Sequence, residues 1–237
     1  MELYEFWQEH YQRIFASGES YLDYSNETVQ LQGFAAVLDG SGGIRGKRCL
    51  DVGAGTGLFS RTLHALGAAH VCAVDFIPKA IEELRTSTPQ VDSKLAKADE
   101  ITPNMFQSPF DRVYVIEVLQ YLDFDRITQN LWSLVAPGGR LVGVVPNADN
   151  AIVAQVIQRF ESKFRAVPAA ALMHKLNSLP DLSVARFKGL SFGNDQSVAA
   201  YESTTWNKQI ASSENFNRIA FVAVKTPVTV HRPSLAS

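Results

Sequence analysis

The sequence predicts an α/β domain built on a mostly parallel sheet. Apolar runs of strand length alternate with amphipathic helices over residues 45–146, and short turns join them. A strand, a glycine-rich turn and a helix open this alternation at residues 49–60, and two more strands close the chain at about 182–192 and 218–225. Because strands that alternate with helices form sheets covered on both faces, we expect seven strands with helices on each side.

Length and composition suit one sizeable soluble domain. The 237 residues are 46% hydrophobic and 19% charged, with a formal net charge of −2, which favours neither nucleic acid nor an anionic membrane as a partner. No apolar run approaches the roughly 20 residues that cross a bilayer, and residues 1–5 do not resemble a signal peptide. Cys49 and Cys72 fall in predicted strands and are expected to be buried thiols, so a cytoplasmic protein is the simplest interpretation.

Residues 1–44 are predicted to form a helical segment ahead of the sheet. Aromatic residues recur at helical spacing between Phe6 and Phe15, and a second helix is expected at residues 26–39. Two compatible interpretations stay open: the aromatic stripe packs on the domain, or the segment forms a lid over a ligand site. The tyrosines of interest for a lid are Tyr11, Tyr21 and Tyr24.

The turn after the first strand carries the clearest ligand signal. Its spacing is Gly53-x-Gly55-x-Gly57, with Asp51 two residues before the first glycine. A backbone with few side chains lets a ligand approach closely, and the helix N-terminus that follows favours acceptors and anions. The dinucleotide fingerprint needs a further glycine at position 58, where this chain has Leu58, so a nicotinamide oxidoreductase is a distant alternative.

Acidic residues follow the next three strands. Asp75 ends the strand at residues 70–76, where a carboxylate can accept hydrogen bonds from both hydroxyls of a ribose. Asp99 follows the strand at residues 93–98, although aspartate after a strand is also common turn chemistry. Glu117 ends the strand at residues 110–117, at the edge where open α/β sheets place reacting groups.

The second half of the chain departs from a minimal alternation. A helix is expected at residues 125–135 and a fifth strand at residues 141–146, with the glycines of Pro137-Gly138-Gly139 reversing the chain between them. Residues 147–180 contain two helical patterns, which predict a helical insertion before the sixth strand. His174 lies on the second pattern and is either a packing residue or a catalytic one.

These landmarks occur in the order found in class I S-adenosylmethionine-dependent methyltransferases, and the chain resembles this family, in particular its type 11/12-like, small-molecule branch. The resemblance implies a Rossmann-like, seven-stranded sheet of order 3-2-1-4-5-7-6. It also implies an N-terminal lid over residues 1–44 and a methyltransferase domain over residues 45–237, with a cap at 147–180. The implied cofactor site consists of Asp51, Gly53, Ala54, Gly55, Gly57, Asp75, Phe76, Ala98, Asp99, Glu100, Glu117 and Tyr21.

The segment after the fourth strand differs from the family pattern. Val118-Leu119-Gln120-Tyr121-Leu122 resembles the frequent V-L-E-H-L sequence, but Gln120 and Tyr121 replace the glutamate and the histidine. The (D/N)-P-P-(Y/F/W) sequence of base- and amide-directed N-methyltransferases is also missing. The catalytic candidates are therefore Tyr121, His174 and Glu117, with His10 as a further base. No metal-ligand pattern is present, so no metal is expected.

The resemblance implies an enzyme that binds S-adenosyl-L-methionine and releases S-adenosyl-L-homocysteine. The expected acceptor is an oxygen or nitrogen atom of a small molecule of secondary-metabolite, sugar or phenol type, and the expected assembly is a monomer or homodimer. Two alternatives stay open. A macromolecular substrate would need a basic or extended docking surface, and a non-catalytic partner protein would bind the cofactor without turnover.

Overall fold

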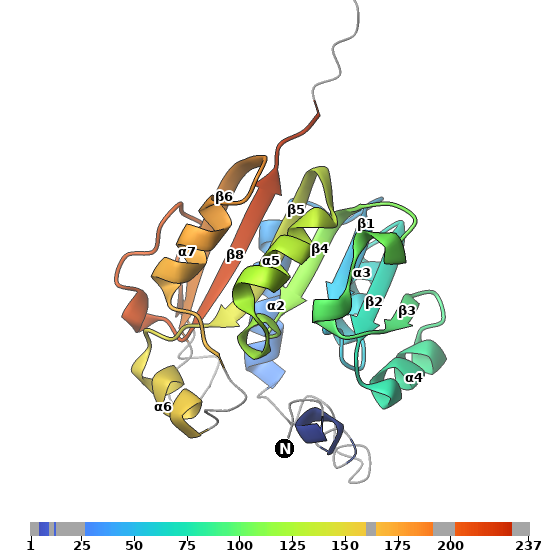
Figure 1. The fold of residues 1–237 in the computed structure, drawn as a ribbon, viewed down its shortest axis with the longest axis horizontal. Helices are drawn as coiled ribbons and strands as arrows, with labels where there is room; N and C mark the ends of the chain where they lie inside the picture. Colours follow the sequence, from blue (N-terminus) through green and yellow to red (C-terminus); the bar gives the residue numbers. More distant parts are fainter. Residues whose placement is uncertain (1–4, 10–11, 13–26, 160–164, 192–201, 229–237) are drawn as a thin grey trace, which may run out of the picture.

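The computed structural model describes residues 5–9, 12, 27–159, 165–191 and 202–228, and its centre is one eight-stranded sheet (Figure 1). The strand order is β3-β2-β1-β4-β5-β8-β6-β7. The strands are β1 (Arg48–Val52), β2 (His70–Asp75), β3 (Asp92–Leu95), β4 (Phe110–Ile116), β5 (Val135–Pro146), β6 (Leu182–Ser191), β7 (Glu202–Ser203) and β8 (Arg218–Lys225).

The predicted strand order is confirmed. The first five strands pair in parallel, and β8 lies antiparallel between β5 and β6. The last predicted strand is β8, and the two-residue β7, which the sequence did not indicate, pairs with the far side of β6. Because β5 and β6 both oppose β8, every strand from β1 to β6 runs in one direction. Ligand-binding residues are therefore expected at their common carboxyl edge.

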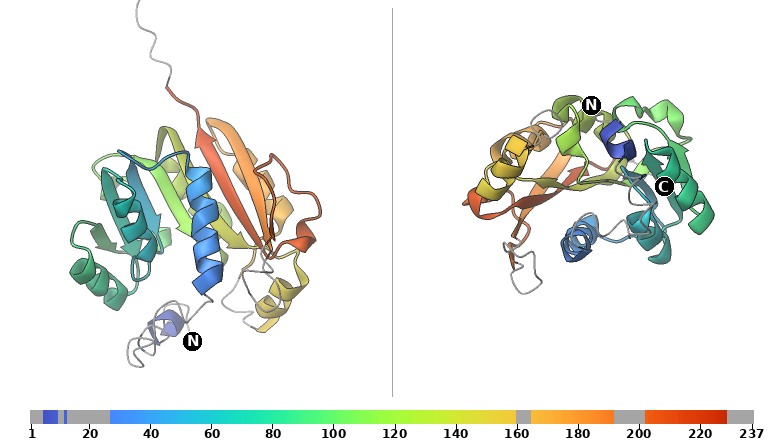
Figure 2. Two further views of the ribbon diagram at one scale, coloured as in Figure 1. Left: turned by 180° about the vertical axis from the view of Figure 1, so that it is seen from behind. Right: turned by 90° about the horizontal axis from the view of Figure 1, so that it is seen from below.

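Helices cover both faces of the sheet, as predicted. Residues of α2, α3 and α4 share one cluster of buried side chains with the strands, and residues of α5 and α7 share another. Seen from behind, α2 crosses the sheet on the first of these faces (Figure 2). The helices are α2 (Glu27–Ser41), α3 (Leu58–Ala65), α4 (Pro78–Ser87), α5 (Phe124–Ser133), α6 (Ala151–Arg159) and α7 (Ala169–Asn177). Among the described helices, none combines the length and apolar composition that a membrane-spanning segment needs.

The sequence Pro137-Gly138-Gly139 is not the turn that we predicted. It lies inside β5, which begins at Val135. Phe110 of β4 pairs with Val135, whereas Arg112 pairs with Arg140, so the residues between them on β5 form a bulge. A glycine pair after a helix can therefore lie in a bulged strand as well as in a turn that reverses the chain.

Parts of the segments proposed as lid and cap pack on the faces of the sheet, and another part lies at its carboxyl edge. Helix α2 packs on the sheet through Ala36 and Val37, and α7 packs on the other face through Leu172 and Leu176. Residues 5–9 instead lie beside the start of α4, where Trp7 is buried against Ile77 and Ala80. The boundary between a lid and a domain at residue 45 stays a prediction.

Candidate functional site

The turn after β1 owes its spacing to backbone conformation. Gly53, Gly55 and Gly57 have φ angles of 74°, 54° and 83°, which residues with side chains rarely adopt. A Cβ added at Gly53 would overlap Val118, and one added at Gly57 would overlap Leu84. The alternating glycines are therefore required by the path of the chain itself. They also leave the backbone of the turn free of large side chains.

Asp51 connects the strand before this turn to the helix after it. Its side chain is 3% exposed, and its Oδ2 accepts a hydrogen bond of 2.6 Å from the Ser60 hydroxyl in α3. Burial raises the pKa of the Asp51 carboxyl to about 7, while the Ser60 hydrogen bond opposes that rise. The contact joins the end of β1 to α3 across the glycine turn, and the expected contact of Asp51 with a cofactor stays a prediction.

Asp75, at the end of β2, reaches the turn directly. Its Oδ2 accepts a hydrogen bond of 2.8 Å from the Gly55 N–H, and its Oδ1 accepts one of 2.9 Å from the Ile77 N–H. Burial raises the pKa of the carboxyl, and these backbone donors oppose that rise. The backbone of Phe76 contributes a further hydrogen bond that lowers the pKa, so three backbone donors hold the carboxylate at the end of β2.

The third acidic position lies on a short helical turn rather than directly at a strand end. Strand β3 ends at Leu95, and residues 98–100 form the 3-10 helix η2 (Ala98–Glu100). Asp99 is half-buried, whereas Glu100 is exposed and pairs with Lys97 at 3.6 Å. The Ala96 N–H donates to the Asp75 carbonyl at 3.0 Å, which brings the chain before η2 to the carboxyl edge of β2.

Glu117 follows β4 in an unusual backbone conformation. It has a φ of 55°, one of the positive values that non-glycine residues rarely adopt and that concentrate at functional sites. Its Oε1 accepts a hydrogen bond of 2.6 Å from Arg218 Nε. Its Oε2 and its carbonyl oxygen both accept from Gln120 Nε2, at 3.3 and 2.8 Å. Partial burial raises the pKa of Glu117, and the positive charge of Arg218 opposes that rise.

Aromatic side chains join the N-terminal segment to the same edge. Tyr121, on the 3-10 helix η4 (Leu119–Tyr121), meets Trp7 edge to face with ring centroids 5.3 Å apart. Trp7 also meets Phe6 at 5.4 Å and packs with Ile77 of the loop after β2. Trp7 therefore contacts both the end of β2 and the segment after β4.

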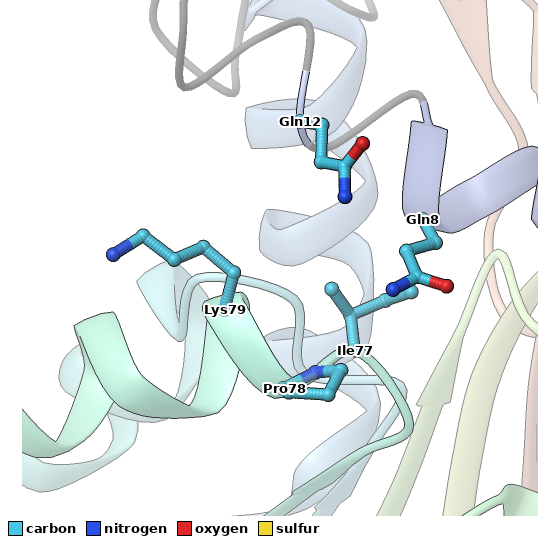
Figure 3. Close-up of a pocket in the computed structure, with 5 residues that line it drawn as sticks. All are labelled: Gln8, Gln12, Ile77, Pro78 and Lys79. Carbon is cyan, nitrogen blue, oxygen red and sulfur yellow. The ribbon is translucent and has the colours of Figure 1, made fainter.

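A small hollow borders this aromatic contact. Its volume is about 120 Å³, and Gln8 and Gln12 of the N-terminal segment face Ile77, Pro78 and Lys79 across it (Figure 3). Ile77 lies two residues after Asp75, so the hollow adjoins the expected ribose position.

The comparisons with known proteins agree with this geometry. A family model described as a methyltransferase domain matches residues 50–141, which include the glycine turn, Asp75 and Glu117. A ubiquinone biosynthesis O-methyltransferase from Xanthomonas euvesicatoria pv. vesicatoria (strain 85-10) is 31% identical over 189 residues, 77% of this chain and 77% of the relative. The chain belongs to the S-adenosylmethionine-dependent methyltransferases.

Other proteins match this chain with different coverage. A ubiquinone biosynthesis O-methyltransferase from Xylella fastidiosa (strain M23) is 31% identical over 137 residues. That match spans 56% of this chain and only 55% of the relative's length. A crystal structure of a possible histamine N-methyltransferase from Thermotoga maritima has a TM-score of 0.69 at 15% identity, covering 94% of this chain and 98% of that one. At that identity the likeness concerns the fold alone.

The family's cofactor fits the residues present. The glycine turn offers backbone without large side chains, and the Asp75 carboxylate, an acceptor of the kind that a ribose hydroxyl needs, lies against that turn. Within the described ranges, no group of three or more His, Cys, Asp and Glu residues is placed to hold a metal ion.

The other predicted methyltransferase residues are not all brought together. Glu117 and Tyr121 lie at the same edge as the glycine turn. His174 does not join them in any described contact: it is exposed on α7, whose buried residues face the sheet. A histidine facing solvent on the outside of a packed helix is no longer our candidate base. Tyr21, His10, Tyr11 and Tyr24 lie outside the described residues.

The sequence did not predict the contacts of two residues at the carboxyl edge of the sheet. Arg218 is 101 positions from Glu117 in the chain, and the spacing gives no sign of their contact. Trp7 belongs to the aromatic stripe that we recognised, but its position over Tyr121 depends on how the first helix docks.

Proposed function

We propose that this methyltransferase transfers a methyl group from S-adenosylmethionine to an oxygen or nitrogen atom of a small metabolite. The observation that carries the proposal is the glycine turn held against the Asp75 carboxylate by the Gly55 N–H. Relatives at about 30% identity are named ubiquinone biosynthesis O-methyltransferases, which supports an acceptor of metabolite size. The near-neutral charge of the chain also favours a small acceptor over a polyanion.

The residues that would hold the cofactor follow from their places at the edge. Asp75 would accept hydrogen bonds from the ribose hydroxyls. Phe76 would flank the adenine ring and Asp99 would accept from its amino group. The turn at residues 53–57 would face the amino-acid end. When bound, this cofactor supplies an electrophilic methyl group on a sulfonium.

The chain's own contribution is positioning, exclusion of water and proton removal. Holding the acceptor atom in line with the methyl carbon supplies much of the rate, because the reaction becomes effectively intramolecular. Trp7 and the segment around it would shield the reacting atoms, as expected of a lid. An acceptor hydroxyl also needs a base, and Glu117 is our first candidate because it is a carboxylate directly after the end of β4, at the carboxyl edge of the sheet.

Methyl transfer tests the proposal directly. The protein is incubated with methyl-labelled S-adenosylmethionine and a small-molecule extract of its host, and products are analysed by mass spectrometry. We expect a labelled product of low mass with the wild type and none with Asp75→Ala. Label found only in protein or nucleic acid would contradict the small-molecule acceptor. Tight binding of S-adenosylhomocysteine without any labelled product would contradict the proposed catalysis.

A further inference from the structure

The contact between Arg218 and Glu117 crosses the end of β5. Arg218 is the first residue of β8 and lies in register with Pro146, the last residue of β5. Strand β5 separates β8 from β4, so the guanidinium extends across its end to reach Glu117, with Nε 2.6 Å from Oε1. Because β8 runs against its neighbours, its start lies at the carboxyl edge where β4 ends.

The pair is only partly shielded from solvent. The Arg218 side chain is 26% exposed and that of Glu117 is 37% exposed. Arg218 also anchors itself, since its Nη1 donates to the Asn217 carbonyl at 3.1 Å. A guanidinium fixed at two of its nitrogens presents a rigid fork, which restricts the carboxylate more than a lysine ammonium would.

Gln120 restrains Glu117 from another direction. The Gln120 side chain is 1% exposed, and its Nε2 donates to both the carbonyl and the Oε2 of Glu117. Its Oε1 is buried and has no hydrogen-bond partner in the part of the chain that the structure describes. A buried acceptor without a partner costs about 1–3 kcal/mol, and such groups call for a water or a ligand donor. The unmet acceptor lies on the amide that touches Glu117.

We propose that Arg218 is a positioning residue of the methyl-transfer site, which holds the Glu117 carboxylate ready to take a proton from the acceptor molecule. The inference rests on the proposed function. The O–H bond of the acceptor breaks, its proton forms a bond to Glu117 Oε2, and the electron pair stays on the acceptor oxygen as the nucleophile. Gln120 orients the same carboxylate through the hydrogen bond that its Nε2 donates to Oε2. The acceptor is therefore a hydroxyl compound or an amine that carries N–H.

A purely structural role for the pair predicts different behaviour. If the pair only joined β4 to β8, its loss would lower stability. The ionisation of Glu117 would then have no effect on the pH dependence of turnover. The described groups whose charges or dipoles act on Glu117 are Arg218 from β8 and the Gln120 amide from η4. Removing the positive charge of Arg218 must therefore favour the protonated form of Glu117.

The test compares Arg218→Gln, Arg218→Lys and the wild type. Arg126, exposed on α5, supplies the matched control Arg126→Gln. Glu117 is titrated in ¹³C-glutamate-labelled full-length protein, with its carboxyl signal assigned by its absence in Glu117→Gln. We expect titration about one pH unit higher or more in Arg218→Gln, largely restored in Arg218→Lys and unchanged in Arg126→Gln. Unchanged titration in a folded Arg218→Gln would overturn the proposal.

The pH dependence of turnover supplies the second readout. The acceptor identified from the labelled extract is used to measure kcat/KM against pH. In Arg218→Gln, the midpoint of the acid limb should move to higher pH by the same amount as the Glu117 titration. If the carboxyl titration moves but the acid limb does not, Glu117 is not the base and the inference fails. If the wild type transfers no methyl group at all, the proposed function fails instead, and the titration shows whether Arg218 still controls Glu117.

Discussion

The Asp75 carboxylate accepts a hydrogen bond of 2.8 Å from the backbone N–H of Gly55, twenty residues earlier in the chain. The same carboxylate accepts from Ile77 at 2.9 Å, so one side chain fixes both the glycine turn and the loop after β2. These two loops form the two sides of the expected cofactor site. Their relative position is therefore set by the residue that we expect to contact the ribose.

Asp75→Ala should weaken binding of S-adenosylhomocysteine at least tenfold. The variant loses the carboxylate expected to contact the ribose and the hydrogen bond to Gly55, and titration calorimetry measures the change. Asp92→Ala is a suitable control, because Asp92 is exposed at the start of β3 and pairs with Lys94 at 3.5 Å. That surface pair should contribute less than about 1 kcal/mol. Binding by Asp75→Ala within about 0.5 kcal/mol of the wild type would show that the ribose assignment is wrong.

Gly57→Ala should destabilise the protein by about 2 kcal/mol or more. A methyl group there would meet Leu84 and impose a φ of 83° on a residue that disfavours it. Gly33→Ala is the matched control, because Gly33 lies inside α2 with nothing within 4 Å of its added Cβ. It should be neutral or more stable by about 0.5–1 kcal/mol. Urea denaturation measures both, and equal free energies of unfolding would contradict the steric argument.

The stability of the protein should fall as the pH rises towards 7, in part through Asp51. Its pKa is about 7 in the folded protein against 3.8 without the surroundings of the fold. Between these values the folded protein binds more protons than the unfolded chain, so the free energy of unfolding decreases with rising pH. Asp51→Asn should flatten this decrease between pH 5 and pH 8 while keeping an acceptor for Ser60. Identical slopes for the two proteins in denaturation experiments across that range would refute the assignment.

Asn147→Asp should destabilise the loops around the carboxyl edge of β5. Asn147 is fully buried, and its Nδ2 donates to the carbonyl oxygens of Ser213 and Phe216 at 2.7 and 2.8 Å. Aspartate would place an acceptor against two acceptors, with an expected loss of about 2 kcal/mol or more. Asn104→Asp, at an exposed position of a 3-10 helix, should change stability by less than about 0.5 kcal/mol. Equal effects of the two substitutions would rule out this role for Asn147.

Local patterns predicted the parts of this protein that local physics determines. The alternation of strands and helices follows hydrophobic spacing, and the three glycines follow from backbone angles, so both are legible along the chain. Asp75 was predictable because the end of a parallel strand fixes where its next side chain lies. The complete strand order came from the resemblance to a family rather than from spacing.

Contacts between distant segments were beyond such reasoning. Nothing local indicates that Arg218 meets Glu117 or that Trp7 lies on Tyr121, because both contacts depend on how separate elements dock. The Pro137-Gly138-Gly139 sequence fits a reversal and a bulge equally well, and only pairing with β4 decides between them. The outward side of α7, which carries His174, likewise depends on which face of the helix the sheet covers.

The position of β8 between β5 and β6 determines when the sheet can form during synthesis. Strand β6 is synthesised earlier, yet its only long partner in the described sheet is β8, the last strand that the structure describes. Nascent chains that end before residue 218 thus contain Glu117 but neither its cationic partner nor the strand that joins β6 to β5. We expect truncation before residue 218 to abolish folding and activity together, because it removes both contacts at once.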